Sequence, residues 1–509
     1  MGERQNQWRR SCLFGLLAGA IGLGVADARA ATHYVSLDGH AVSPYTNWYN
    51  AATSLVQALS AVPSGEAGNN SEILVSNGTY FCTATFTWDT TWKYRKITVR
   101  SLYGSTNTIL DGTNLVPNAS WSYGFYLNAT SMLQGFTFTN FLVNAVAYRD
   151  GPGTTNDHQL IDCVFVGSPV DPVRHVSGNH SLSVSNCVIR DNWASGIGGN
   201  FVGYLAVYDS VISGNRNGGI VSTPTKAMIV RDSTISGNAR PGGGGGIYGN
   251  SGTGIIYNCV ITGNSATNGS GGGVSGAVTI ENCVISSNYA AGHGGGIYNA
   301  TRVSHCTIAD NVSSNYGGGT RGCQEVSYCR ISGNYAKNGG GGIYGSASVR
   351  NCLVVHNRSS GLDYAGQGGG IGSGGVVANC TVVSNISDWV SGGVFRSSCV
   401  NSIIYDNAAP GANDNYWVND TVYMPWTNCI TMPDPATVTV GGTGCITSAP
   451  MLDVGFKPVK GSPAINAGVY RDWMDGALDL DGQPRISQDA VDIGAFEFQA
   501  SAGTVMVVR

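Results

Sequence analysis

The chain repeats one short pattern ten times between residues 187 and 407. Each copy contains a small residue, an aliphatic residue two places later, and an asparagine three places after that. The small residues recur every 22 to 28 residues, at Cys187, Ser210, Ser233, Cys259, Cys283, Cys306, Cys329, Cys352, Cys380 and Ser402. A recurrence near 23 residues that shows strand-type alternation and no helical periodicity is typical of a solenoid of stacked β coils.

Each copy also shows where the chain bends. A second aliphatic residue stands three places before the small one, as Ile256 does before Cys259, and an odd offset cannot keep both side chains inward on one straight strand. In eight of the ten copies the residue before the small one is Asn or Asp, which tolerate the left-handed conformation of a tight corner. A third short strand follows a glycine cluster, as at Gly246-Ile247. Three strands and three corners per coil predict an all-β, three-sheet parallel β-helix.

The cysteines fall into two groups. Eight of the fourteen, Cys163 and the seven of the repeat, occupy one inward slot of successive coils, where cysteine acts as a small hydrophobic residue. We expect a stack of buried thiols, with a ladder of disulfides as the alternative; equivalent slots form a row, which does not match a tetrahedral metal site. Cys429 and Cys445 lie outside the ten copies and are predicted to form a disulfide.

Composition and the N-terminus bear on location and partners. The net charge is -4 and only 11% of residues are charged, so nothing favours nucleic acid or an anionic membrane as a partner. Three arginines precede an apolar stretch from Cys12 to Ala26, and Ala28-Arg29-Ala30 resembles a cleavage site. This pattern predicts a signal peptide over residues 1–30 and export. We expect no transmembrane segment after its removal, because no later stretch is long enough.

The expected organisation follows from where the repeat is regular. Residues 31–134 should form an N-terminal cap and the first, degenerate coils, with an amphipathic capping helix over residues 48–62 that covers the open end of the first coil. Residues 135–407 should form regular coils of about 23 residues. Residues 408–498 should form a C-terminal capping or anchor-type module, followed by a tail at 499–509.

Several segments resemble known families. Gly78-Thr79-Tyr80, residues 108–112 and the coils are similar to the pectin-lyase-like right-handed β-helix superfamily, which implies a right-handed solenoid. The Gly-Gly-Gly-Ile blocks resemble the repeats of polymorphic outer-membrane proteins, although Cys or Ser stands where those have Phe. Residues 462–468 and 479–497 are similar to the choice-of-anchor module of bacterial surface proteins. These resemblances imply a bacterial protein that is secreted or associated with the cell surface or outer membrane. The superfamily includes lyases, hydrolases and adhesins, so the resemblance does not imply one activity.

A set of aromatic residues suggests a binding face. If the aliphatic residue after each glycine cluster points inward, the next residue points outward, and successive coils are about 4.8 Å apart. The outward residues include Tyr248, Tyr298, Tyr344 and Phe395, interrupted at Ser275, Arg321 and Gly372. Such a column could contact an extracellular polysaccharide or a surface protein of a host or neighbouring cell. The alternative is that these surface rings pack among themselves.

A second set of residues suggests catalysis. Asp171, Arg174 and His175, within residues 149–191, could act as acid, clamp and base on a uronic acid polymer, or they could be unrelated charges of a solvated loop. Gly292-His293-Gly294 is similar to a fragment of polygalacturonases, but the accompanying aspartates and Arg-x-Lys are absent, which favours a corner-loop histidine.

In the C-terminal module, Asp479 and Asp481 resemble part of a calcium loop. The alternative is a turn that locks the module, with Arg485 paired to Asp492 or Glu497. We expect no cofactor other than possible Ca²⁺.

The sequence as a whole favours a monomeric secreted or cell-surface β-helix protein for adhesion or glycan binding. The alternative is a polysaccharide lyase or glycoside hydrolase with its site within residues 149–191.

Overall fold

The computed structural model describes residues 31–499, except for 63–70, 89–95, 117–122, 150–154, 178, 200–202, 224–225, 250–253, 362–366, 411–413, 418–423, 438–441 and 488. The predicted signal peptide and all but the first residue of the predicted tail lie outside the described residues.

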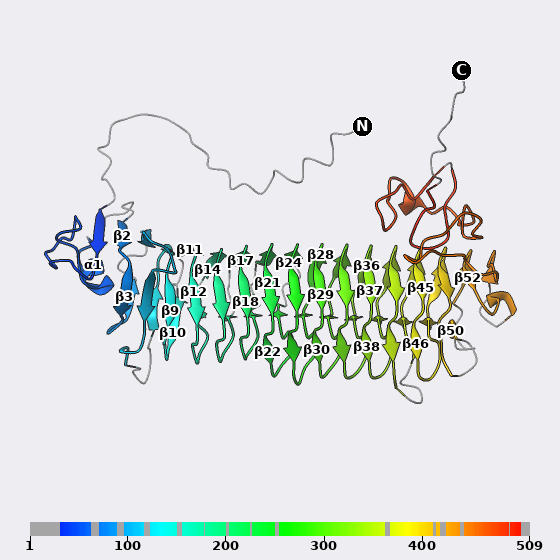
Figure 1. The fold of residues 1–509 in the computed structure, drawn as a ribbon, viewed down its shortest axis with the longest axis horizontal. Coiled ribbons are helices and arrows are strands. Elements are labelled where there is room, and N and C mark those ends of the chain that lie inside the picture. Colours follow the sequence, from blue (N-terminus) through cyan, green and yellow to red (C-terminus); the bar gives the residue numbers. More distant parts are fainter. Residues whose placement is uncertain are drawn as a thin grey trace, which may run out of the picture.

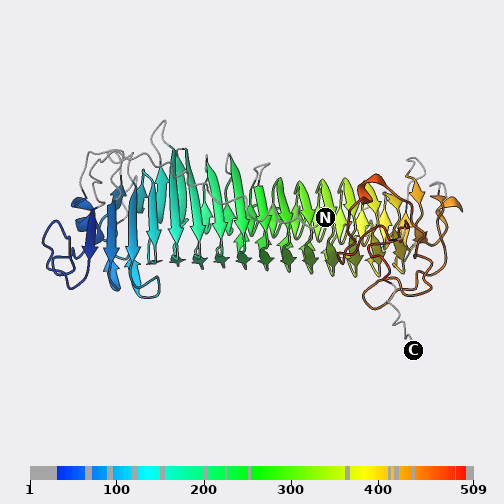
Figure 2. The same cartoon turned by 90° about the horizontal axis from the view of Figure 1, so that it is seen from above.

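The described chain forms a long rod of stacked coils (Figures 1 and 2). One coil runs through four short strands, β20 (Ala227–Arg231), β21 (Thr234–Ser236), β22 (Ala239–Arg240) and β23 (Ile247–Tyr248). Each strand pairs in parallel with the equivalent strand of the next coil. Four parallel sheets result, which we name A, B, D and C in the order in which the chain visits them.

Within the described residues, sheets A, B, C and D have 17, 15, 14 and 7 strands. Sheet A runs from β1 (Thr32–Val35) to β53 (Gly442–Thr443), and sheet B from β3 (Gly78–Phe81) to β52 (Ile430–Thr431). Sheet C runs from β4 (Phe86–Trp88) to β50 (Tyr416–Trp417), and sheet D from β22 to β46 (Ile386–Ser387). The predicted all-β parallel β-helix is confirmed.

Sheet D was not expected. Its strands are two residues long, and no glycine cluster precedes them as it does the two-residue strands of sheet C. The signal it does leave is a small buried residue two places after the repeat asparagine, at Ala266, Ala290, Ser313, Ala336, Ser359 and Ser387.

The corners use left-handed backbone where the sequence predicts it. The residue before each small one has a positive φ in all ten copies, for example 52° at Asn258 and 54° at Asn282. The two copies without Asn or Asp have His305 and Tyr328 at this corner, also at positive φ. Their rings stack with centroids 4.8 Å apart and planes 2° apart, a contact that offsets part of the conformational strain.

The small residues form a continuous buried row, as expected. The Cys283 amide donates to Cys306 Sγ at 3.4 Å, and Cys306 Sγ donates to the Ser304 carbonyl at 3.1 Å. A serine makes the same two contacts: Ser210 Oγ accepts from the Cys187 amide at 3.1 Å and donates to the Tyr208 carbonyl at 2.6 Å. Either Cys or Ser can therefore occupy this position, because each offers one acceptor and one donor in a small volume.

Cys429 and Cys445 extend the buried row of small residues. Ile430 and Ile446, the residues that follow them, form a parallel bridge, so the two cysteines stack at the end of the same row. Both are free thiols in this structure, with their side chains in contact, and the disulfide between them stays a prediction. A hydrogen bond from Cys429 lowers the pKa of the Cys445 thiol to about 7.

The repeat asparagines form a second buried row, the asparagine ladder. Asn311 Nδ2 donates to Asn334 Oδ1 and to the Ile285 carbonyl, both at 2.9 Å. Asn311 Oδ1 accepts from the amide of Asn288 at 3.0 Å and from Asn288 Nδ2 at 2.9 Å. The side chains thus satisfy buried backbone groups at the corner between sheets B and D, which is the reason the position requires an amide.

The N-terminal capping helix is shorter than predicted. The helix expected over residues 48–62 is present only as α1 (Leu55–Ser60), and Ser54 caps its N-terminus. The preceding residues instead form a turn, in which the Ala51 amide donates to the Trp48 carbonyl at 3.3 Å, and a bridge to β1, in which the Ala52 amide donates to the Tyr34 carbonyl at 2.9 Å. The helix buries Leu55, Ala58 and Leu59 against the first coils.

The solenoid continues past residue 407, where the repeat was expected to end. Strands β50, β51 (Trp426–Thr427), β52 and β53 add to the sheets. The repeat pattern is lost here because Tyr416 and Trp426 replace the inward aliphatic residues, and both are buried.

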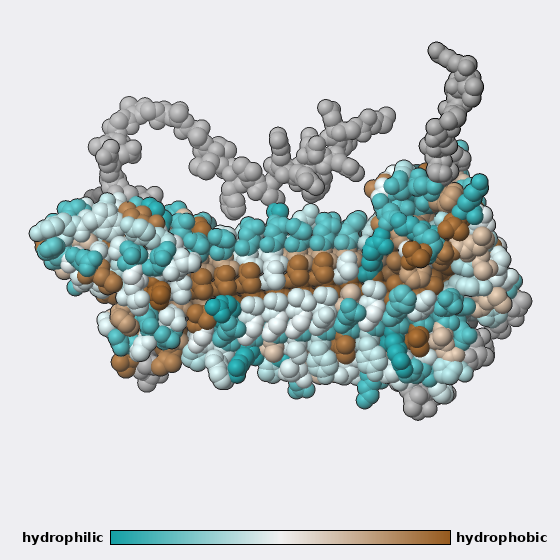
Figure 3. Space-filling model, in the orientation of Figure 1, coloured by the Kyte–Doolittle hydropathy of each residue, from teal (hydrophilic) through white to brown (hydrophobic). Residues whose placement is uncertain are grey.

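Residues 447–499 form an irregular C-terminal module beside the last coils (Figure 1, orange to red). It covers the outer face of sheet B, where Ile493, Ala495 and Phe496 pack with Leu353, Val383 and Ile403. Further toward the N-terminus, outward residues of sheet B such as Val211, Val260 and Val284 are 39 to 42% exposed. Figure 3 shows a brown, hydrophobic stripe along the middle of the rod. No described helix has the length and apolar character needed to cross a membrane.

Candidate functional site

The outer face of sheet C carries one column of aligned side chains. Strand pairing places Tyr248, Ser275, Tyr298, Arg321 and Tyr344 directly beside one another on successive coils. The expected alignment of ring residues is therefore present in the structure. Within the described residues the column consists of Thr87, Tyr126, Ala147, Arg174, Gly198, Val221, Tyr248, Ser275, Tyr298, Arg321, Tyr344, Gly372, Phe395 and Trp417.

The middle of the column joins two residues of the glycine corner. The His293 ring lies 6.2 Å from Tyr298 and 5.8 Å from Tyr316, and Tyr316 lies 4.5 Å from Tyr344. The Arg321 guanidinium lies 5.6 Å from the Tyr298 ring, within the range of a cation–π contact. We call these five half-buried side chains, from three successive coils, the ring patch.

The glycine corner explains how the two sets of rings meet. Gly317 and Gly340 have φ of +72° and +63°, and a Cβ on either would lie 2.7 Å from the Cβ of Arg321 or Tyr344. Only glycine lets the loop lie this close to the strand that follows. Tyr316 stands immediately before Gly317, and His293 stands before the equivalent left-handed Gly294, so both rings are held against the rings of the sheet-C column.

The ring patch is weakly basic. Burial and the nearby Arg321 charge lower the pKa of His293, so the imidazole is neutral at neutral pH. Arg321 carries the positive charge of the patch, and none of its five side chains is a carboxylate.

The ends of the predicted ring column differ from the middle. Phe395 is only 1% exposed and stacks on Trp417 at 4.9 Å, so the expectation that it presents a free ring is wrong. Tyr248 lies two coils from Tyr298 and is covered on one side by the Arg240 guanidinium at 4.3 Å. Tyr298 and Tyr344 are the two predicted ring residues that the structure places within the patch.

The acid, clamp and base predicted at Asp171, Arg174 and His175 do not converge. Arg174 and His175 are neighbours on β13 (Val173–Ser177), so their side chains point to opposite faces. Arg174 is exposed, whereas His175 is buried in the solenoid. Asp171 Oδ1 accepts the amide of Ser195 at 2.9 Å and so holds a turn of the next coil.

Inside the solenoid, His175 belongs to a cluster of buried rings. Its ring lies 4.4 Å from His180, which lies 5.2 Å from His158, and Tyr148 lies 4.4 Å from His158. His158 Nδ1 is also 2.8 Å from Ser131 Oγ. Burial, reinforced by the neighbouring histidines, holds the pKa of His158 well below its usual value. All four rings are buried, so this cluster belongs to the interior of the solenoid and not to its outer face.

Asp479 and Asp481 are engaged with protein groups. Asp479 is buried and accepts the amides of Asp481, Gln483 and Glu497 at 2.7 to 2.9 Å. Asp481 pairs with Arg330 at 2.6 Å and with Lys457. Arg485, predicted to pair with Asp492 or Glu497, is buried and bonds Glu497 at 2.7 Å. The segment has the geometry of the predicted module lock, and no described group of three or more His, Cys, Asp or Glu side chains is arranged to hold a metal.

Three members of the ring patch are not expected from the sequence. It favours a corner-loop role for His293, has Arg321 as an interruption of the tyrosines, and gives no expectation for Tyr316. His293 and Tyr316 do share a signal, because each stands immediately before the left-handed glycine of its coil, Gly294 or Gly317. The contact itself joins one coil's loop to a neighbouring coil's strand, which the repeat pattern alone does not show.

Comparison with known proteins gives the following similarities. The family model described as right handed beta helix region matches residues 123–277. The chain is similar to the solved structure of pectate lyase Pel9A at 15% identity, with 93% of this chain and 97% of that chain covered and a TM-score of 0.26. It is also similar to the mannuronan C-5 epimerase AlgE6 A-module of Azotobacter vinelandii at 13% identity, with 78% of this chain and 93% of that chain covered and a TM-score of 0.29.

A rhamnogalacturonan lyase structure is similar at 14% identity, with 82% of this chain and 83% of that chain covered and a TM-score of 0.21. TM-scores this low carry no information about activity. No curated protein sequence matches the chain. The family-model match over residues 123–277 agrees with the stacked parallel sheets, and the described chain forms a right-handed parallel β-helix.

Proposed function

We propose that the protein binds an extracellular glycan along the outer face of sheet C, with the ring patch as the main contact. The observation that carries the proposal is the set of ring contacts between adjacent coils, His293 with Tyr316 and Tyr316 with Tyr344. Sugar rings have apolar faces that stack on aromatic side chains, and the Arg321 guanidinium adds hydrogen-bond donors beside the rings.

The setting of the patch also supports binding. Tyr298, Arg321 and Tyr344 lie on strands whose backbones pair in register with both neighbouring coils. Little ordering is therefore needed when a ligand binds, and pre-organised sites lose less free energy to ordering. A polymer that follows the rod can contact several coils at once, which raises its apparent affinity through multivalency.

The composition of the patch favours binding over cleavage. Hydrolysis of a glycosidic bond generally uses a pair of carboxyl groups, and the five side chains of the patch include none. The residues proposed for the catalytic alternative, Asp171, Arg174 and His175, point in different directions. We also propose, from the signal sequence, that the protein acts outside the cell or at its surface.

Affinity electrophoresis in gels that contain uronic or neutral polysaccharides tests the proposal. We expect Tyr298→Ala and Tyr344→Ala each to weaken retention, with a loss of about 0.5–1.5 kcal/mol per ring, or a two- to tenfold rise in Kd. Tyr204→Ala is the matched control, because Tyr204 is an exposed tyrosine on sheet A.

Three results would contradict the proposal. Equal retention of Tyr298→Ala, Tyr344→Ala and the control would show that the ring patch is not the contact. New reducing or unsaturated ends in the incubated polysaccharide, lost in Arg174→Ala, would favour the lyase or hydrolase alternative. Retention on protein-coated surfaces without retention in any glycan gel would point to a protein partner.

A further inference from the structure

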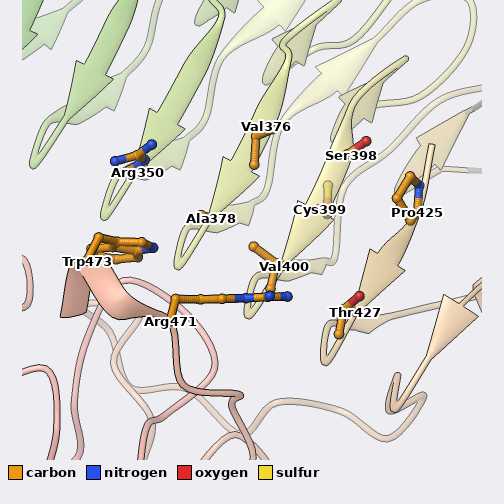
Figure 4. A pocket seen from close by; sticks show the side chains of 10 residues that line it. All are labelled: Arg350, Val376, Ala378, Ser398, Cys399, Val400, Pro425, Thr427, Arg471 and Trp473. Atoms are coloured by element: carbon orange, nitrogen blue, oxygen red, sulfur yellow. The ribbon is translucent and has the colours of Figure 1, made fainter. Parts of the chain in front are cut away.

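A groove lies where the C-terminal module meets the outer face of sheet A (Figure 4). Its volume is about 350 Å³, and it is lined by Arg350, Val376, Ala378, Ser398, Cys399, Val400, Pro425, Thr427, Arg471 and Trp473. The lining comes from β40 (Ser348–Arg350), β44 (Val376–Ala378), β48 (Ser398–Val400) and β51, and from the module segment that includes η4 (Asp472–Met474).

The floor of the groove results from a change of side-chain size along one column. Strand pairing aligns Arg350, Ala378, Val400 and Thr427 on the outer face of sheet A. The long arginine is followed by three short side chains, so the surface steps down beyond Arg350. The floor is apolar at Ala378 and Val400 and carries a hydroxyl at Thr427.

The module supplies the opposite wall. The corner residue Asn401 holds it, because Asn401 Oδ1 accepts the Val469 amide at 2.8 Å and Asn401 Nδ2 donates to the Val469 carbonyl at 2.7 Å. Met474 is fully buried and fixes the other end of the short helical turn. In Figure 4 the side chain of Arg471 extends toward Val400 and Thr427, and Trp473 lies near Arg350. The Arg350 guanidinium is 5.7 Å from the Trp473 ring.

The groove carries positive charge without an acidic neighbour in its lining. None of its ten lining residues is Asp or Glu, and neither Arg350 nor Arg471 takes part in an ion pair found among the described residues. Other arginines on this face of sheet A are paired: Arg302 with Glu325 at 3.3 Å and Arg231 with Asp232 at 3.6 Å. Asp472, between the two module residues in sequence, does not line the groove.

We propose that this groove binds an anionic sugar unit, with its carboxylate or sulfate held by Arg350 and Arg471 and its ring against Trp473 and the apolar floor. Arginine is suited to such anions because its planar fork of donors matches their oxygens. The volume is at the small end for a ligand pocket, which fits one or two sugar rings. A bare inorganic anion would leave the floor at Ala378 and Val400 uncovered.

An acidic peptide fits less well. Peptides that bind to sheets usually gain affinity from main-chain hydrogen bonds to a free strand edge. The strands below the groove, β40, β44 and β48, each pair on both sides, so they offer no free edge. The site is on sheet A and does not depend on the ring patch of sheet C.

Isothermal titration of the full chain with digalacturonate and with the neutral digalactose tests the proposal. We expect binding of digalacturonate only, weakened at least about tenfold in Arg471→Gln, because a charge-assisted hydrogen bond is lost. Trp473→Leu should weaken digalacturonate binding while the arginines remain. Arg231→Gln, which removes a paired arginine of the same face, and Tyr298→Ala, in the ring patch, should leave digalacturonate binding unchanged.

Arg471 is exposed, so Arg471→Gln should fold normally, and an unchanged thermal unfolding midpoint will confirm it. The proposal is overturned if digalactose or inorganic sulfate binds as tightly as digalacturonate, if a tetraglutamate peptide does so, or if Arg471→Gln binds digalacturonate like the unmodified chain. Loss of binding in Tyr298→Ala with no effect of Arg471→Gln would place the acidic sugar at the ring patch instead.

Discussion

Replacing one residue of the asparagine ladder with alanine is a direct test of what stabilises the solenoid. Asn311→Ala removes four side-chain hydrogen bonds: two that Asn311 donates, to Asn334 and to the Ile285 carbonyl, and two that it accepts from Asn288. Asn288 and Asn334 are at most 1% exposed and Asn311 is fully buried, so water cannot replace these bonds without opening the corner.

The expected loss follows from the number of bonds. A buried hydrogen bond contributes about 1 kcal/mol net, so four bonds give a loss of about 4 kcal/mol in the free energy of unfolding. The Asn288 amide, which is the donor in one of these four bonds, is left buried without its acceptor. The matched control is Asn338→Ala, because Asn338 makes one side-chain bond, to Asn315 Oδ1 at 2.7 Å, at a partly exposed position. Its removal should cost less than about 1 kcal/mol.

Urea unfolding followed by circular dichroism measures the two losses, and hydrogen exchange locates them. A solenoid coil interacts mainly with its neighbours, so unfolding can deviate from a two-state transition. Faster exchange in Asn311→Ala should therefore be centred on the coils that contain Asn288, Asn311 and Asn334. A loss below about 1 kcal/mol, or exchange no faster than in Asn338→Ala, would refute the argument that the ladder stabilises the coils.

Three further predictions concern the core. The folded state keeps His158 neutral, whereas the unfolded chain takes up a proton on this residue below about pH 6.5. The stability should therefore be full above that pH and fall by up to about 1.4 kcal/mol per pH unit below it. In thermal melts from pH 8 to 5, the melting temperature should depend less on pH in His158→Gln than in the unmodified chain, and His305→Gln, on the surface, should show no such change. Cys329→Ser should change stability by less than about 1 kcal/mol because Ser210 occupies an equivalent slot, whereas Cys329→Val should lose about 1–3 kcal/mol through overpacking, as thermal melts can measure. Mass spectrometry of the protein under oxidising conditions should show that Cys429 and Cys445, which are in contact, lose two hydrogens as a disulfide; two intact thiols after oxidation would contradict this expectation.

The repeat made the coil predictable because each inward position is subject to the same physical demand. A buried slot of fixed size requires Cys or Ser, and a left-handed corner favours Asn or Asp, so the spacing of Cys259, Asn258 and their equivalents determined strand and corner together. The ring column followed from the period of two along a strand. The same rule places His175 inside, since it stands two residues after the buried Val173.

Other features had no such signal. Sheet D is hidden because its two-residue strands lack the glycine cluster that marks the equally short strands of sheet C. The solenoid beyond residue 407 is hidden because Tyr416 and Trp426 fill slots that aliphatic residues fill elsewhere. The groove on sheet A joins Arg350 of one coil to Arg471 of an irregular module. That contact depends on how the module packs on sheet B, which no local pattern encodes.

This difference separates the residues that build the rod from those that can give it a function. The inward rows and the asparagine ladder carry the stability, so most substitutions at outward positions leave the fold unchanged. Outward residues such as Arg321 and Arg350 are therefore free to vary from coil to coil, and they interrupt the sequence pattern without disturbing the fold. In a solenoid, a departure from the repeat at an outward position is then the better indicator of function, whereas regularity indicates the scaffold. Arg321, which interrupts the tyrosines of sheet C, and Arg350, which precedes three short side chains on sheet A, are both departures of this kind.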